Sequence, residues 1–323
     1  MSFRRHPSWL RQRVPDPFAF TRMKLLFDNL SLHTVCESAQ CPNQAQCFSQ
    51  QTATFLIMGD VCTRNCGFCA IRKGLPLPLD PCEPRNVALA ASKLRLKHAV
   101  VTSVTRDDLT DGGASHFART IAAVQQSCHI TIEVLVPDFQ GSVEALQTIV
   151  DCFPEVINHN IETVPRLYHG VRPKADYWRS LQLLRTVKSL NHGIVTKSGL
   201  MLGLGERHHE VLAVMKDLRA AGCDCLTMGQ YLPPSPGHYP LVRYIEPSEF
   251  KEYEDLATGI GFISVCSGPL VRSSFNALEM YQKVQRRFAE HYFGSNDTDV
   301  AHVLGHLPLH RSRLDIRQRF CYL

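Results

Sequence analysis

The sequence predicts an α/β fold, because short β-branched runs alternate with longer helical stretches from residue 54 onward. Such alternation gives parallel strands joined by crossover helices. About six units are visible, too few for an eight-unit barrel, which leaves a partial β/α barrel or an open doubly wound sheet. No Gly-x-Gly-x-x-Gly follows the first strand, which disfavours a dinucleotide-binding sheet. In a barrel, the chemistry lies on loops at the carboxyl ends of the strands.

Seven segments are predicted to be strands, and one segment between them is a clear helix. In segment 130–136 apolar residues recur with a period of two, as in a strand. Segment 206–221 carries its apolar residues on one helical face and is followed by Gly222, which is suited to end a helix. The predicted strands are 54–58, 98–102, 130–136, 155–161, 194–202, 224–230 and 262–266. The apolar helical face consists of Val211, Val214, Met215 and Leu218.

The composition excludes several classes of protein. Hydrophobic residues make up 44% and charged residues 20% of the 323 residues, which excludes a disordered or fibrous chain. The net charge of +5 is not gathered into a basic patch, so we expect no nucleic-acid partner. No run of 18 apolar residues is present, so we expect no membrane span.

Thirteen cysteines are the unusual feature of this composition. They are too few for a disulfide scaffold, and the basic start MSFRRHPSWLRQR lacks the apolar core of a secretory signal. Thiols in an intracellular chain more often serve metal or redox chemistry. We therefore expect a cytoplasmic protein. The matrix of an organelle is the alternative, because the Arg-rich start also fits a short transit peptide, which Asp16 soon interrupts.

Immediately after the first strand, Cys62, Cys66 and Cys69 form a C-x3-C-x2-C loop. Three thiolates at this spacing can hold a four-iron cluster, which normally takes four ligands, so one iron stays open. An open coordination position is typical of a working metal centre. A structural zinc site would require a fourth ligand, and the next cysteine, Cys82, lies beyond three prolines.

A second triplet, Cys36, Cys41 and Cys47, has C-x4-C-x5-C spacing. Alone it is weaker evidence, because nearby His33 offers a fourth ligand for a Cys3His zinc site. Two three-thiol sets in one intracellular chain favour a second iron–sulfur cluster. Two four-iron clusters are therefore expected.

Taken together, these motifs resemble the radical S-adenosylmethionine (SAM) enzymes, and within them the lipoyl synthase family. The resemblance runs from about residue 8 to residue 279. One departure is visible, because Phe275 stands where the family usually has tyrosine. The motifs are PSWLR, HTVCESAQCPN, DVCTRNCGFCA, VTSVTRDDLTDGGASHFA, IEVLVPDFQG, NHNIETVPRLYHGVRP, TKSGLMLGLGE, LTMGQYLPPS and SGPLVRSSFNA.

The resemblance implies a partial (β/α)6 TIM-type barrel of the radical SAM kind and a division into three parts. Residues 1–53 would be an N-terminal extension with the auxiliary-cluster cysteines, 54–266 the barrel, and 267–323 a C-terminal extension with the Arg-Ser-Ser motif. The tail has a helical start, MYQKVQRRFAEHYF, and a basic end that serves as a solvated surface or a docking element. That end contains Arg311, Arg313, Arg317 and Arg319.

The activity that the resemblance implies is insertion of two sulfur atoms at C6 and C8 of an octanoyl chain on a lysine of a carrier domain. The cluster on Cys62, Cys66 and Cys69 would bind SAM, and the cluster on Cys36, Cys41 and Cys47 would donate sulfur. The fourth ligand of the donor cluster maps onto Ser274, and Arg272 and Ser273 would lie near it. Asn160 and Glu162 end a predicted strand, and the Arg172 guanidinium is suited to bind a carboxylate. The candidate SAM contacts are Asn160, Glu162, Arg172, Gly203 and Glu206.

The implied partners are octanoylated lipoyl carrier domains, either E2 subunits of 2-oxoacid dehydrogenases or the H protein of glycine cleavage. An electron donor such as ferredoxin or flavodoxin and an iron–sulfur cluster carrier are implied as well, and the protein is expected to be a monomer. Three alternatives stay open: a sulfur-inserting enzyme similar to biotin synthase, a zinc-stabilised binding module, and an electron carrier. The first shares only the C-x3-C-x2-C loop, and the second predicts zinc without iron.

Overall fold

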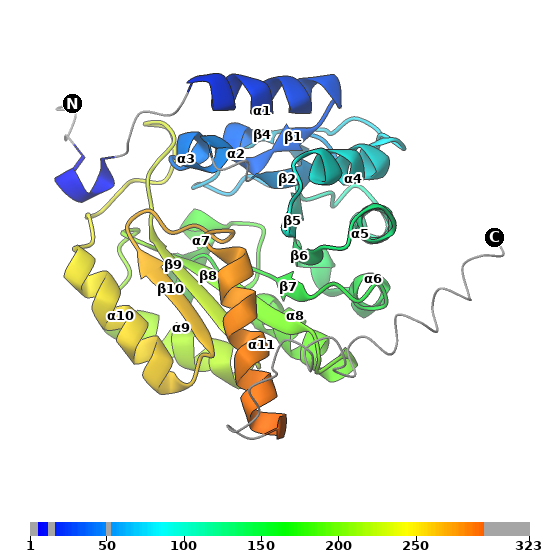
Figure 1. Ribbon diagram of the computed structural model, residues 1–323. Coiled ribbons are helices and arrows are strands. Elements are labelled where there is room, and N and C mark those ends of the chain that lie inside the picture. The colour runs from blue at the N-terminus through cyan, green and yellow to red at the C-terminus, as the bar shows by residue number, and fades with distance from the viewer. Residues whose placement is uncertain (1–5, 12–16, 50–52, 294–323) are drawn as a thin grey trace.

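Seven parallel strands and one short antiparallel strand form the eight-stranded main sheet of the computed structural model, which describes residues 6–11, 17–49 and 53–293 (Figure 1). The seven segments predicted to be strands are confirmed, with ends shifted by up to three residues. The predicted basic end with Arg311, Arg313, Arg317 and Arg319 lies outside the described residues. The strands are β2 (Thr54–Ile57), β5 (His98–Ser103), β6 (Thr131–Leu135), β7 (Val156–Asn158), β8 (Val195–Leu202), β9 (Cys225–Gln230) and β10 (Ser264–Gly268).

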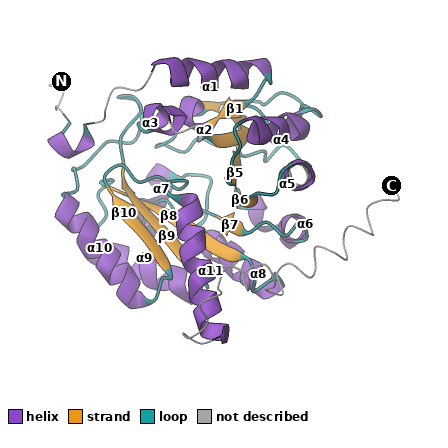
Figure 2. Ribbon diagram, viewed as in Figure 1, coloured by secondary structure: helices purple, strands orange, loops and turns teal. Residues whose placement is uncertain are grey.

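Helices connect successive strands on the outer side of this sheet, and the N-terminal segment covers one end of it (Figure 2). The crossover helices are α4 (Glu83–Lys93), α5 (Ala114–Ser127), α6 (Val143–Val150), α7 (Tyr168–Val171), α8 (Tyr177–Leu190), α9 (His208–Ala220) and α10 (Pro247–Ile260). The N-terminal segment contains η1 (Ser8–Leu10), α1 (Pro17–Asn29), β1 (His33–Thr34), α2 (Val35–Ser38) and α3 (Gln44–Ser49). Short elements are β3 (Val61–Cys62), β4 (Arg72–Lys73), η2 (Phe139–Gly141) and η3 (Pro165–Leu167), and the last helix is α11 (Ala277–Phe293).

The strand order is β1-β2-β5-β6-β7-β8-β9-β10, with only β1 antiparallel to its neighbour. The six strand–crossover–strand connections from β2 to β10 confirm the predicted α/β class with a mostly parallel sheet. Within the described ranges β1 and β10 form no pair, so the sheet stays open. No helix in that same part of the chain is long and apolar enough to cross a membrane.

The sheet curls around the last helix. Helix α11 contacts both β5 and β10, which lie far apart in the strand order. Its Tyr281 ring stacks on His98 at the start of β5, with 6.4 Å between ring centroids. The side chains that pack on α11 come from the first residues of β7, β8 and β9, which are Val156, Val195 and Cys225. Because one helix meets the amino ends of these strands, the sheet is a partial barrel, as predicted.

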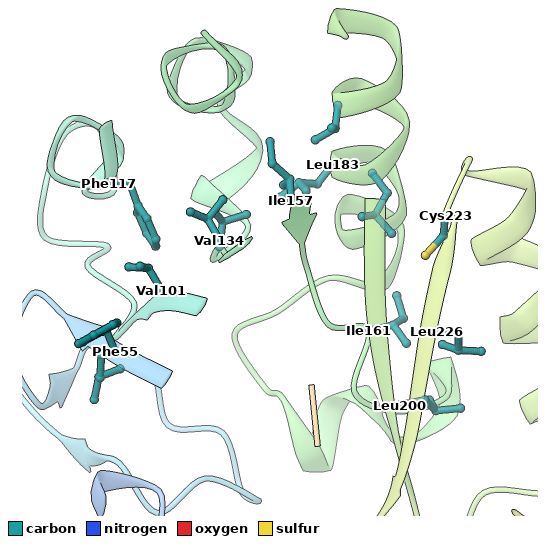
Figure 3. Packing of buried hydrophobic residues seen from close by; sticks show 14 of the residues in the cluster. Phe55, Val101, Phe117, Val134, Ile157, Ile161, Leu183, Leu200, Cys223 and Leu226 are labelled. Atoms are coloured by element: carbon teal, nitrogen blue, oxygen red, sulfur yellow. The ribbon is translucent and has the colours of Figure 1, made fainter. Parts of the chain in front are cut away.

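The core lies between the sheet and the outer helices. Figure 3 shows Phe117 of α5 turned towards Val101 and Phe55 of the sheet, and Leu183 of α8 beside Ile157. The helical interpretation of 206–221 is confirmed by α9, whose predicted apolar face is fully buried. Gly222 follows α9 with a φ of 83°, a conformation that favours glycine and ends the helix.

The inner side of the barrel carries a buried ion pair rather than apolar residues alone. Lys197 Nζ of β8 donates to both carboxylate oxygens of Glu133 of β6, at 3.0 and 3.1 Å. Burial opposes ionisation of Glu133, but the charge of Lys197 and the contacts with His98 and Asn158 together outweigh it and lower the Glu133 pKa to about 2. Asn158 of β7 donates to the same carboxylate. This pair separates the end covered by α11 from the carboxyl ends of the strands.

Candidate functional site

The C-x3-C-x2-C loop leaves β2 and is held in place by backbone hydrogen bonds from distant segments. The Gly67 amide donates to the Val171 carbonyl at 2.8 Å, and the Gly67 carbonyl accepts from the Tyr239 amide at 2.8 Å. A Cβ at position 67 would stand 3.1 Å from the Gly170 carbonyl oxygen, so this close approach favours glycine. The Arg64 amide donates to Cys62 Sγ, at 3.4 Å, as amides near metal-binding thiolates do. The loop is therefore preformed by the protein.

Arg64, inside this loop, forms the strongest electrostatic contacts of the site. Its guanidinium donates to both carboxylate oxygens of Asp107, at 2.7 and 2.9 Å, and to both of Asp138, at 3.0 and 2.6 Å. Burial opposes ionisation of Asp138, but the hydrogen bonds and charge of Arg64, with smaller contributions from His159 and the Gln140 amide, together outweigh it and lower the Asp138 pKa to about 2. Asp107 follows β5 and Asp138 follows β6, so the cysteine loop is tied to two neighbouring strand ends.

We expect Asp138→Asn to lower the free energy of unfolding of the metal-free protein by about 2–3 kcal/mol at pH 7, the amount that a carboxyl contributes when an ion pair lowers its pKa to about 2. A pKa lowered from 3.8 to about 2 contributes stability above pH 3.8 that is lost as the pH falls towards 2. The gap between wild type and variant should therefore shrink below pH 4. Urea unfolding from pH 7 to pH 3 measures it, and equal unfolding free energies at pH 7 would contradict the assignment.

The three thiols of the loop lie close to one another. Burial raises the pKa of Cys69 to about 12, and the neighbouring Cys66 and Cys62 add to the shift. Burial raises the pKa of Cys66 as well, opposed by the positive charge of Arg172. The Cys66 and Cys69 thiols are therefore protonated at neutral pH without a metal, and binding iron there would release protons.

Three of the predicted SAM contacts meet beside this loop. Arg172 Nη1 donates to the carbonyl oxygens of Asn160, at 3.0 Å, and Ile161, at 3.3 Å. Asn160 Nδ2 donates to Glu162 Oε1 at 3.0 Å. Within the described chain, the buried Arg172 Nε and Asn160 Oδ1 have no hydrogen-bond partner. Unpartnered buried polar atoms are rare, so they indicate room for a polar ligand here.

Glu162 has an unusual backbone conformation, with a φ of 65°. This left-handed conformation is uncommon outside glycine and clusters at functional sites. The Glu162 amide and carbonyl both bond to β8, to Gly199 and Met201, at 2.9 Å each. Burial raises the pKa of the Glu162 carboxyl, and the charge of Arg172 opposes that shift. The side chain is thus held between Arg172 and Asn160.

Gly203 and Glu206 belong to one turn after β8. The Glu206 carboxylate accepts from the amides of Gly203, at 2.6 Å, and Leu204, at 2.9 Å. Gly203 has a φ of 105°, and a Cβ there would meet Gln230 Nε2 and the Arg243 carbonyl oxygen. Both residues therefore have a structural role in this turn. Their contact with SAM stays a prediction.

The second triplet is built around α2 and α3. Thr34 caps α2 by accepting from the Glu37 amide at 3.3 Å, and this helix carries Cys36. The Cys41 amide bonds to the Cys36 carbonyl at 3.1 Å. Burial raises the pKa of Cys36 to about 12, with a further contribution from Cys41 and Cys47, so these thiols are also neighbours.

The Arg-Ser-Ser segment contacts the segment of the second triplet and one of the predicted SAM contacts. Asn43 Nδ2, between Cys41 and Cys47, donates to the Leu270 carbonyl at 2.6 Å. Arg272 is buried beside Cys41: burial lowers its pKa, and the Cys41 thiol opposes the shift. Asn160 Nδ2 donates to Ser273 Oγ at 2.5 Å. We call residues 270–275 the connecting loop. Ser274 lies half-buried in this loop.

A single-ion site is not present in the described part of the chain. No three His, Cys, Asp or Glu side chains there converge as they would on one metal ion. His33, the fourth ligand of the zinc alternative, lies instead near Asp60, whose pKa is lowered by hydrogen bonds from Arg72 and, more weakly, by His33. The thiols of a four-iron cluster each bind a different iron, so they need not converge on one point.

Three residues of the site were missed by the sequence analysis: Arg64, Asp107 and Asp138. All three lie in quoted motifs, but their contacts join positions 43 and 74 residues apart. The available signal was that each aspartate follows a predicted strand, where a barrel places its site residues.

The comparisons with known proteins cover nearly the whole chain. A radical SAM superfamily profile matches residues 56–218, and a profile of the N-terminal domain of lipoyl synthase matches residues 1–41. The lipoyl synthase of Caldanaerobacter subterraneus subsp. tengcongensis is 58% identical over 84% of this chain and 96% of its own length. That of Alkaliphilus metalliredigens is 54% identical over 88% and 98%. The chain belongs to the lipoyl synthase family.

Solved structures support the fold of this lipoyl synthase family member. The crystal structure of methylornithine synthase matches with a TM-score of 0.50 over 91% of this chain and 97% of that chain, at 14% identity. The family prediction is confirmed, and it decides against the biotin synthase-like, zinc-module and electron-carrier alternatives. Membership implies SAM, a 4Fe–4S cluster and an auxiliary cluster.

Proposed function

We propose that this chain inserts two sulfur atoms at C6 and C8 of an octanoyl group attached to a lysine of a lipoyl carrier domain. The name of its relatives, lipoyl synthase, and their high identity over most of the chain support this activity. C6 and C8 are unactivated C–H positions, which acid–base groups cannot attack, so a cofactor must supply the reactive species.

Cys62, Cys66 and Cys69 hold the cluster that binds SAM. Their neighbouring thiols and the amide directed at Cys62 Sγ fit this role. When bound, the cluster and SAM supply a 5′-deoxyadenosyl radical that abstracts hydrogen from the octanoyl chain. Arg64 fixes the loop through Asp107 and Asp138, so the ligands are positioned before the cluster arrives.

Arg172, Asn160 and Glu162 orient SAM. The unpartnered Arg172 Nε offers a donor for the methionyl carboxylate, and Asn160 Oδ1 offers an acceptor for an amino or hydroxyl group. The Glu162 carboxylate is held by Asn160 and fits an ammonium or ribose hydroxyl. Gly203 and Glu206 shape the turn after β8 that borders the nucleoside end of SAM.

Cys36, Cys41, Cys47 and Ser274 hold the sulfur-donating cluster. A hydroxyl oxygen is a harder ligand than a thiolate and suits iron less well among soft ligands. Ser274 would therefore be the weakest of the four ligands, and the bound cluster would supply the sulfur. Arg272, buried beside Cys41, compensates the negative charge of the thiolates. Ser273 stays bonded to Asn160.

The observation that carries this proposal is that the connecting loop contacts both the segment of the second triplet and the predicted SAM-binding residues. Through Leu270 it meets the Cys36–Cys47 segment, and through Ser273 it meets Asn160, which also bonds to Glu162. Sulfur can be transferred only if its donor and the hydrogen-abstracting group reach the same carbon chain. One loop in contact with both sides fits that requirement.

The first experiment is the iron, sulfide and zinc content of protein prepared without oxygen, followed by reaction with an octanoyl-lysine peptide. Two four-iron clusters predict about eight iron atoms and eight sulfides per chain with essentially no zinc. With SAM and a strong reductant, we expect a peptide heavier by two sulfur atoms, detected by mass spectrometry. About four iron atoms after full reconstitution, or zinc in their place, would contradict the proposal.

The remaining assignments follow from this activity. The carriers are E2 subunits of 2-oxoacid dehydrogenases or the glycine cleavage H protein, the reductant is a ferredoxin or flavodoxin, and the location is cytoplasmic. The chain acts as a monomer. The chain divides into 1–53, 54–266 and 267–323 according to which ligands each part provides. The first part provides Cys36, Cys41 and Cys47 of the auxiliary cluster at the rim of the barrel, and the last part provides Ser274.

A further inference from the structure

Two leucines beside the C-x3-C-x2-C loop are among the most exposed large hydrophobic side chains in the described structure. Leu75 is 87% exposed and Leu77 is 80% exposed. Single exposed apolar residues are normal on protein surfaces, but two nearly fully exposed leucines within three residues form a cluster that calls for a partner. We call residues 74–80 the leucine loop.

The leucine loop is fixed to the cysteine loop at its start. Strand β4 pairs with β3, so that Lys73 lies opposite Cys62. The Gly74 amide then donates to the Cys62 carbonyl at 3.0 Å. Arg72 is held by Asp60 through a bidentate ion pair with a shortest distance of 2.6 Å. Leu75 is therefore one residue removed from a direct contact with a proposed cluster ligand.

The end of the leucine loop is fixed as well. Leu79 packs on the main core, and the Asp80 carboxylate accepts from the Cys82 amide at 2.8 Å. Helix α4 then begins at Glu83, whose buried carboxylate accepts from the Met58 amide and contacts His116 Nε2 at 2.6 Å. Both ends of the loop are thus anchored to the body of the protein.

Proline makes the exposed part stiff. The loop reads Leu75-Pro76-Leu77-Pro78-Leu79, and each proline fixes its own φ and restricts the residue before it to extended conformations. Such a segment loses little conformational entropy when a partner covers it. An exposed pair of leucines on a preordered frame offers apolar area that a partner can cover, with the charged side chains of Arg72 and Lys73 at its rim, as in an interface with an apolar centre and a polar rim.

We infer that the leucine loop is the docking surface for the folded lipoyl carrier domain. This inference rests on the proposed function, in which the octanoyl chain stays attached to a lysine of its carrier. That chain and its lysine are short, so the carrier must stand against the surface next to the cysteine loop while C6 and C8 reach the site. The leucine loop is the apolar, rigid surface that lies there.

The test compares two substrates, an octanoylated carrier domain and a short octanoyl-lysine peptide. The double variant Leu75→Gln/Leu77→Gln should raise KM for the carrier domain by about tenfold or more, because it removes two central apolar contacts. Its kcat/KM for the peptide should stay within about twofold of wild type. Leu89→Gln, which changes an exposed leucine on α4, is the matched control and should leave both substrates unaffected.

Binding of the carrier domain to the metal-free protein, measured by calorimetry, provides a readout that is independent of the clusters. We expect the double variant to weaken this binding by the same factor as KM. Equal losses with both substrates would make the leucine loop part of the active-site architecture, and no loss with either would place docking elsewhere; both results would overturn the inference. Failure of wild-type protein to modify even the peptide would instead refute the proposed function.

Discussion

We expect the Cys66→Ala protein to release no measurable 5′-deoxyadenosine from SAM. Cys66 lies between Cys62 and Cys69 in the loop, and the positive charge of Arg172 acts on its thiol. Its removal leaves two ligands for the proposed SAM-binding cluster. The rate of SAM cleavage should fall by roughly 10³-fold or more, as when a group that acts only as part of a unit is lost. Chromatography of reduced reaction mixtures measures it.

Cys82→Ala is the control for this variant, because Cys82 is an exposed cysteine outside both triplets. It should keep wild-type SAM cleavage. The loss in Cys66→Ala should also come without unfolding, since the Gly67 and Arg64 contacts that fix the loop do not involve the Cys66 side chain. Normal formation of 5′-deoxyadenosine by a folded Cys66→Ala protein would refute the assignment of this triplet.

The strands and the cysteine triplets could be predicted from sequence because their signals are local. A strand such as β2 is a short apolar run, and the ligands Cys62, Cys66 and Cys69 lie within eight residues of one another. Spacing of this kind is read directly from the chain. The Arg-Ser-Ser segment was tied to the auxiliary triplet only through family resemblance, and the structure supplies a physical link, the contact between Asn43 and Leu270.

The contacts that organise the site could not be predicted, because they join residues far apart in the chain. Asn160 and Ser273 are 113 positions apart and meet only when the sheet curls. From the sequence alone, Arg64 looks like an ordinary surface cation. In the folded chain it forms ion pairs with two aspartates, Asp107 and Asp138. Glu133 shares a strand with an alternating pattern that assigns it to the polar side, yet the interior of the barrel buries it against Lys197.

These contacts also imply that the two thiol sets are mechanically connected. Asn160 bonds to Ser273 of the connecting loop and to Glu162 beside the radical triplet. A change at the auxiliary triplet can therefore disturb SAM binding slightly without removing any of its ligands. Sulfur transfer and SAM cleavage should be separable, but not completely independent.

For that reason we expect Cys41→Ala to abolish sulfur insertion while SAM cleavage falls by no more than about tenfold, the effect of disturbing groups that only support a metal site. Cys41 contributes one of the three thiols of the auxiliary triplet, and Arg272 lies buried beside it. The backbone contact between Cys41 and Cys36 does not need the thiol, so the segment keeps its path. Iron content should fall from about eight to about four atoms per chain.

The measurement that decides this prediction is the ratio of 5′-deoxyadenosine to sulfur-containing peptide in one reaction. Wild-type protein should form about two molecules of 5′-deoxyadenosine per completed product, because two C–H bonds are broken, whereas Cys41→Ala should form 5′-deoxyadenosine with no product at all. Cys128→Ala, a partly buried cysteine outside the triplets, should keep the wild-type ratio. If Cys41→Ala still made product, the sulfur would have to come from a source other than the cluster on Cys36, Cys41 and Cys47.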